Sequence, residues 1–148
     1  MSAMRPGVLL CVSLLACAPR SVDVILNPTS TPGTFSATDI GTLTTPMPEY
    51  PEMAGAAGIE GSCRVSVRFA ADWTAESIQV AIPAGNWALD KSSCSTAMRV
   101  TFEPAPFSRL RLPVHADIDY GFTRQASAFP DSADEFVTIV ETVRVWNE

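Results

Sequence analysis

Residues 50–82 read YPEMAGAAGIEGSCRVSVRFAADWTAESIQVAI, and residues 88–105 read ALDKSSCSTAMRVTFEPA; these two stretches decide the predicted fold. In the first stretch, apolar and polar residues alternate from Cys63 to Phe69 and again from Ile78 to Ile82. A period of two is typical of half-buried strands. Because only a short segment joins the two runs, they predict an antiparallel hairpin.

The period changes in the second stretch. Apolar residues recur every three to five positions from Leu89 onward, which predicts a helix over 88–100 that packs on the apolar face of the hairpin. Prolines at positions 104 and 106 end this helix. Residues 111–122 alternate once more and predict a third strand. The predicted fold over 46–122 is therefore α+β, a small antiparallel three-stranded sheet with one main helix packed on a face.

Length and charge restrict the class of protein. The chain has 148 residues, of which 47% are hydrophobic, enough for one modest domain. The net charge is −6, and Lys and Arg do not form runs. Binding to nucleic acid needs clustered cations, so a nucleic-acid partner is not expected.

Residues 1–17 read MSAMRPGVLLCVSLLAC and have the pattern of an export signal. An apolar run follows the single cation Arg5, and its length of about ten residues is half of the roughly 20 that span a bilayer. The end of the run, from Leu14 to Cys17, resembles the lipobox of bacterial lipoproteins. The resemblance implies that Cys17 is lipidated, and Ala18 after it favours the outer membrane. The alternative is an ordinary cleaved signal in which Cys17 is incidental.

Two segments flank the predicted domain. Residues 18–45 are rich in Ser, Thr, Pro and Gly and predict a flexible tether, in which 22–26 could add an edge strand. Residues 123–148 form a C-terminal extension. The capping-box spacing at 132–135 favours a helix there, whereas the β-branched run VTIVETVRV favours a strand. A helix is the prediction, and either element would block the open edge of the sheet if it docked there.

The central residues resemble the TonB C-terminal domain family. The landmarks are Tyr50-Pro51, Gly58-Ile59-Glu60-Gly61, Leu89-Asp90, Phe102-Glu103-Pro104-Ala105 and Pro113-Val114. The resemblance implies a small helix-on-sheet domain that binds a partner peptide by adding it as a strand to an exposed sheet edge. The third strand matches the position of this edge. The implied partner-binding residues are Leu112, Val114, Ala116, Ile118, Tyr120 and Phe122.

The function predicted from this resemblance is a membrane-tethered periplasmic protein-interaction module, non-enzymatic and linked to outer-membrane receptors or transport. Its expected location is the cell envelope, with a lipid anchor in the outer membrane facing the periplasm. One alternative is an energy-transducing TonB-like component, although the cleaved N-terminus and short spacer argue against it. Another is a structural envelope-assembly lipoprotein.

Two cysteines remain in the predicted mature domain. Cys63 and Cys94 occupy positions where the family pattern has buried apolar residues, one on a strand and one on the helix above it. In an oxidising compartment they are predicted to form a disulfide. The alternative is a pair of small buried thiols that do not react.

Other polar and aromatic residues do not form a catalytic pattern. His115, Asp117 and Asp119 alternate along one strand and are interpreted as a solvated face. Because only His115 could join the cysteines as a ligand, neither a metal nor a cofactor is expected, and no small-molecule substrate is evident. Trp73, Trp87 and Phe107 are expected to cap the core, with a contact patch as the alternative.

Overall fold

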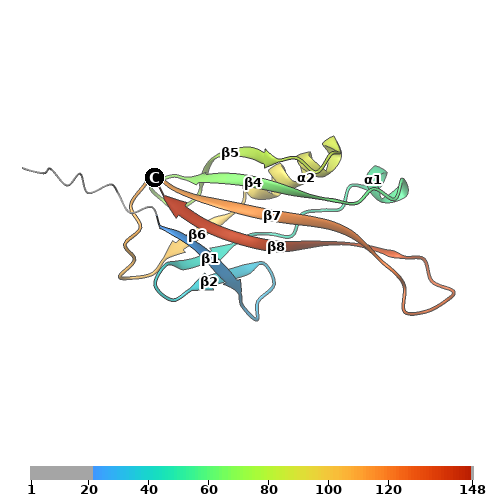
Figure 1. Ribbon diagram of the computed structural model, residues 1–148, viewed down its shortest axis with the longest axis horizontal. Helices are drawn as coiled ribbons and strands as arrows, with labels where there is room; N and C mark the ends of the chain where they lie inside the picture. Colours follow the sequence, from blue (N-terminus) through green and yellow to red (C-terminus); the bar gives the residue numbers. More distant parts are fainter. Residues whose placement is uncertain (1–21, 148) are drawn as a thin grey trace, which may run out of the picture.

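The computed structural model describes residues 22–147, which form one eight-stranded antiparallel sheet and two short helices (Figure 1). The strand order is β5-β4-β7-β8-β1-β2-β3-β6. The prediction of a small three-stranded sheet with one main helix is therefore wrong. The elements are β1 Asp23–Pro28, β2 Thr34–Ala37, β3 Gly41–Thr44, α1 Glu52–Ala56, β4 Gly61–Phe69, β5 Ala75–Ile82, α2 Trp87–Ala97, β6 Thr101–Pro104, β7 Val114–Gln125 and β8 Glu135–Asn147.

The central elements lie where the sequence pattern places them. β4 and β5 form the predicted hairpin, and β7 pairs with the other side of β4. The helix α2 begins after Asn86, whose side chain accepts a hydrogen bond from the Ala88 amide at 2.9 Å. An Asn at this position satisfies one of the free amides of the first helical turn. Local periodicity and capping therefore account for this part of the fold.

The segment that the sequence predicts as a flexible tether contributes three strands. β1 pairs with β8, and β2 and β3 continue the sheet to β6. Leu26, Phe35 and Leu43 from these strands are buried in the core. β2 and β3 have only four residues each, so their stability depends on neighbouring strands rather than on local propensity. The strands at 23–44 differ from a flexible tether because composition does not reveal such pairing, and β1 covers most of the run at 22–26 where a strand was the alternative.

The C-terminal extension is also part of the sheet. β8 is a strand of thirteen residues and not the predicted helix. It pairs with β7 over twelve residues, from Val114 opposite Asn147 to Gln125 opposite Glu135. Its β-branched residues suit a pleated surface better than a helix, and the β7 edge supplies the hydrogen-bonding partner that decides between the two.

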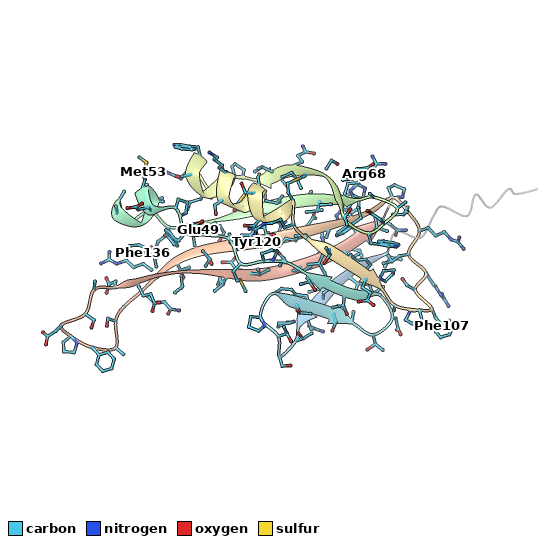
Figure 2. All side chains as sticks on the ribbon, turned by 180° about the vertical axis from the view of Figure 1, so that it is seen from behind. Glu49, Met53, Arg68, Phe107, Tyr120 and Phe136 are labelled. Carbon is cyan, nitrogen blue, oxygen red and sulfur yellow. The ribbon has the colours of Figure 1, made fainter. Side chains whose placement is uncertain are left out.

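The sheet curls into a half-barrel around the core. The turn between β4 and β5 meets the start of β6 through a bridge from Thr74 to Thr101, so the two edge strands approach each other at one end. The helix α2 packs on β4 and buries Leu89 and Ala97. Tyr120 is fully buried and lies in the middle of the molecule in Figure 2; its hydroxyl is 2.9 Å from the Thr45 hydroxyl in the core.

The N-terminal predictions lie outside the described residues. They comprise the export signal of residues 1–17, the lipidated Cys17 and the first part of the tether. Within residues 22–147, no helix is long and apolar enough to cross a membrane.

The pairing of β8 leads to a stability prediction. Val143 is fully buried between Ile118 and Leu26 of the adjacent strands. Val143→Ala should therefore lower the free energy of unfolding by about 2 kcal/mol, because it leaves a cavity in the core. Urea denaturation followed by circular dichroism measures the change.

Ile25→Ala serves as the control, since Ile25 is 60% exposed on β1 and its truncation should change stability by less than about 0.5 kcal/mol. Equal, small effects of the two substitutions would contradict the docking of β8 in the sheet.

Candidate functional site

The strand predicted to bind a partner does not have a free edge in this structure. β7 lies between β4 and β8 and pairs with both. The side chains of Val114, Ala116, Ile118, Tyr120 and Phe122 are fully buried in the core, whereas Leu112 lies before the strand and is exposed. Strand addition at β7 is incompatible with this fold, because β8 occupies the main-chain groups that a partner would use.

The two strands at the ends of the sheet are poorly suited to accept another strand. In β5, the pairing with β4 shifts at two places, so Glu76 and Ala81 are extra residues that bulge from the ladder. β6 has four residues and ends at Pro104, and its Phe102 amide already donates to the Trp73 carbonyl at 3.0 Å. Bulges, short length and proline are features that protect sheet edges from pairing.

A third edge lies inside the strand order. β1 pairs with β8 only from Leu26 opposite Val143 to Asp23 opposite Trp146, because Asn27 and Pro28 pair with β2 instead. Within the part of the chain that the structure describes, residues 135–142 of β8 therefore pair with β7 alone. The sequence EFVTIVET of residues 135–142 was predicted to be helical, so the sequence analysis did not identify this edge. The β-branched residues of the stretch are the signal that favours a strand.

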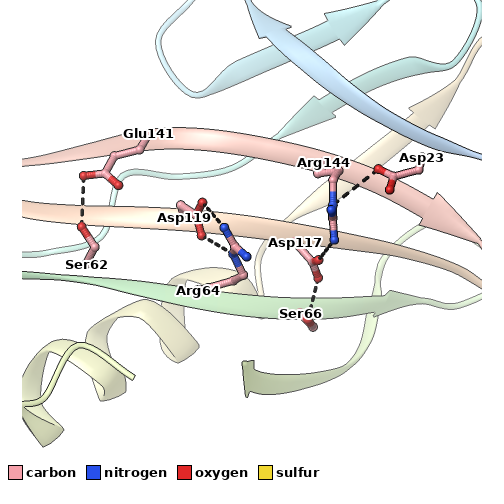
Figure 3. A network of polar contacts seen from close by, with 8 residues as sticks. All are labelled: Asp23, Ser62, Arg64, Ser66, Asp117, Asp119, Glu141 and Arg144. Atoms are coloured by element: carbon pink, nitrogen blue, oxygen red, sulfur yellow. Dashed lines mark hydrogen bonds and ion pairs between the residues drawn. The ribbon is translucent and has the colours of Figure 1, made fainter. Parts of the chain in front are cut away.

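The outer face of the sheet, opposite the core, carries a network of polar side chains on β4, β7 and β8 (Figure 3). Arg64 donates two hydrogen bonds to Asp119, at 2.7 and 2.9 Å. Ser62 donates to Glu141 at 3.0 Å. These contacts join three adjacent strands and fix the orientation of the side chains between them.

Asp117 is the most enclosed carboxylate of this network. It accepts hydrogen bonds from Ser66 at 2.6 Å and from Arg144 at 3.0 Å, and Arg144 also reaches Asp23 at 3.5 Å. Burial opposes ionisation of Asp117, but the hydrogen bond from Ser66 and the hydrogen bond and positive charge of Arg144 outweigh it and hold the pKa of Asp117 below its usual range. Asp117 is thus an ionised structural acceptor, unsuited to deliver a proton near neutral pH.

Cys63 and Cys94 are free thiols in the structure. Cys63 is buried on β4, where burial raises the pKa of its thiol to about 12; Asp90 and Cys94 also raise this pKa, whereas a hydrogen bond with Ser93 lowers it. Cys63 on β4 and Cys94 on α2 are close enough to interact electrostatically. Burial also raises the pKa of the Cys94 thiol. Raised pKa values argue against a reactive thiolate, and the disulfide stays a prediction.

The remaining aromatic residues have different surroundings. Trp73 packs on Phe102 with ring centroids 5.5 Å apart and caps the core, but Trp87 is 68% and Phe107 95% exposed. His115 is half-buried and stacks on Trp146, with centroids 4.2 Å apart. The His115 side chain is thus packed against another ring, whereas the sequence predicted that it would be solvated.

A shallow hollow of about 290 Å³ lies between α1 and α2, and its lining includes Met53 and Trp87. Met53 is 76% exposed and, in Figure 2, points away from the body of the protein. Within the described chain, no group of three or more His, Cys, Asp or Glu could hold a metal ion.

A comparison with models of protein families identifies the family of this chain. The family model of the Gram-negative bacterial TonB protein C-terminal domain matches residues 46–123, more than half of the chain. The chain belongs to the TonB C-terminal family. No significant match was found among curated proteins or among solved structures. The resemblance read from the landmark residues is therefore confirmed.

TonB C-terminal domains are periplasmic protein-interaction modules without enzymatic activity, and membership implies a location in the Gram-negative periplasm or envelope. The matched region ends in β7, so it includes β4, β5, α2 and β7 but not β8. In this chain the TonB C-terminal region is enlarged on both sides, by β1 to β3 before it and by β8 after it.

The hydrogen bonds of Asp117 give the unfolding equilibrium a pH dependence. Because the folded pKa lies below the unfolded value of about 3.9, the stabilisation is fully present above about pH 5 and is lost as the pH falls through the folded pKa. Asp117→Asn should reduce the free energy of unfolding by about 1–3 kcal/mol at pH 7. The difference from the wild type should shrink below pH 4.

Urea titrations between pH 3 and pH 7 measure this difference, and Asp131→Asn, at an exposed carboxylate in the loop between β7 and β8, is the control. A difference for Asp117→Asn that grows as the pH falls would refute the assignment.

Proposed function

We propose that this protein is a membrane-tethered, non-enzymatic protein-interaction module of the cell envelope. The family match over residues 46–123 is the observation that carries the proposal. The fold supports it, since the outer-face carboxylates are held by Arg and Ser partners rather than presented to a substrate. The module recognises an envelope protein and does not convert a small molecule.

The tether is the lipid-modified N-terminus of the mature chain. Its support is the sequence pattern of residues 1–17, which ends in the lipobox-like Leu14 to Cys17. Acyl chains contribute about 0.8 kcal/mol per buried methylene, and stable anchoring needs more than one chain. With Ala18 next to the lipidated residue, the anchor lies in the outer membrane and the domain faces the periplasm.

Lipidation can be tested directly in growing bacteria. Labelled palmitate should enter the wild-type protein and Cys11→Ser but not Cys17→Ser, because only Cys17 stands at the lipobox position. Gel electrophoresis of the immunoprecipitated protein measures the label. Label retained on Cys17→Ser, or absent from the wild type, would contradict the lipid tether.

The interaction function has a separate test. After cross-linking in living cells, quantitative mass spectrometry should recover the same envelope protein with the full chain in every replicate. A control chain of residues 1–45, which keeps the signal and cysteine, should not recover it, because it lacks the matched domain. Equal recovery with both chains, or no specific protein with the full chain, would end the proposal.

A further inference from the structure

We propose that the partner is an extended peptide segment that adds as a strand to residues 135–142 of β8. This inference rests on the proposed function and names its binding surface. The surface, called here the β8 edge, lies in the part of the chain that the family match does not cover. The β8 edge takes the place of β7 as the binding strand, because β7 pairs with β4 on one side and with β8 on the other.

Among residues 22–147, β7 is the only strand that pairs with this edge along its length. β7 holds one side of residues 135–142 in register, from Gln125 opposite Glu135 to Asp119 opposite Thr142. On the other side, β1 pairs with β8 only beyond this stretch and then turns toward β2. At roughly 3.4 Å per residue, the β8 edge is about 27 Å long, which is enough for a strand of ordinary length.

The β8 edge is also rigid before a partner arrives. Phe136 contacts Tyr50, with ring centroids 5.1 Å apart, and Tyr50 contacts Phe122 at 5.5 Å. The Tyr50 hydroxyl donates to the Ile59 carbonyl. A strand held in place by side-chain packing costs little ordering entropy when another strand pairs with it.

Its composition favours pairing. Five of the eight residues in EFVTIVET are β-branched, and the stretch has no Pro, Gly or Lys. Ile139 is 41% exposed on the outer face. β5 and β6 have bulges, short length or proline at their edges, whereas here the single irregularity of the pairing with β7 falls near Glu141. Residues 135–140 are therefore a regular template for main-chain hydrogen bonds.

Charge selects the kind of strand that binds. Residues 125–143 contain Asp131, Glu135 and Glu141 and no Lys or Arg, and a fourth acid, Asp134, is paired with Arg124. Two copies of the β8 edge would bring these acids together, and like charges across paired strands are destabilising. The partner strand is therefore apolar and β-branched, with basic residues at its ends. A second copy of this chain is the disfavoured occupant.

Hydrogen exchange with a defined peptide tests this inference on the full-length protein. The probe is the synthetic peptide KVTVTVK, compared with EVTVTVE and with KVTPTVK, in which proline interrupts the ladder. KVTVTVK should slow amide exchange within residues 135–140 and should bind at least about tenfold more tightly than either control peptide. Protection confined to β5 or β6, or equal binding of all three peptides, would overturn the inference.

A matched pair of variants tests the same surface. Ile139→Lys should weaken KVTVTVK binding at least about tenfold, because it removes an apolar contact from the interior of the edge and adds a cation that repels the basic peptide. Ile25→Lys is the control, because Ile25 is exposed and lies on β1, opposite Arg144 of β8 and outside the β8 edge. This substitution should leave peptide binding unchanged. Circular dichroism and urea midpoints verify that both variants are folded, and if only Ile139→Lys unfolds, Ile139→Thr takes its place.

The outcomes separate this inference from the proposed function. The Ile139→Lys variant can be cross-linked in cells beside the wild type and the control chain of residues 1–45. If the variant still recovers the envelope protein and the control chain does not, the interaction function stands and the β8 edge is excluded as its site. If β8 amides are protected without peptide and the protection grows with protein concentration, a second copy occupies the edge and the inference is overturned.

Discussion

The pairing of β8 with β7 is the interaction on which the rest of this structure depends. It spans twelve residues and places Val143 and Val145 over the core. It also gives β1 a strand to pair with, so β1, β2, β3 and β6 follow in the sheet because β8 is there. Without this pairing, β7 would expose a long main-chain edge, a site of strand addition or aggregation.

The same pairing changes how the family's mode of recognition applies to this chain. The resemblance to TonB C-terminal domains implies recognition through the third strand that the sequence predicts, which is β7. Here the chain's own C-terminal segment satisfies those main-chain groups. The open main-chain groups therefore lie on the next strand, in residues 135–142 of β8, which β1 does not pair with. An interaction module can thus keep its architecture while the position of its free edge is set by residues outside the family region.

The outer face illustrates how a short motif can be misjudged as chemistry or as solvation. Asp117 and Asp119 alternate along a strand, a pattern that suits either a pair of acids or a wet surface. In the structure each carboxylate has an Arg partner from an adjacent strand, and His115 stacks on Trp146 from β8. These partners are distant in sequence, from 27 to 55 residues away for the two Arg contacts. Spacing along one strand does not reveal them.

The sequence by itself determined the β4–β5 hairpin, the helix α2 and the strand β7, because each depends on periodicity and caps within a few residues. The family followed from the resemblance of the landmark residues. The same resemblance placed Cys63 and Cys94 on a strand and on the helix above it. Only the tertiary structure decided that residues 23–44 are strands and that residues 135–147 are a strand rather than a helix. Runs of four residues and β-branched segments have no decisive local preference. Their conformation is fixed by the neighbouring strand that completes their hydrogen bonds, and so is the location of the free edge.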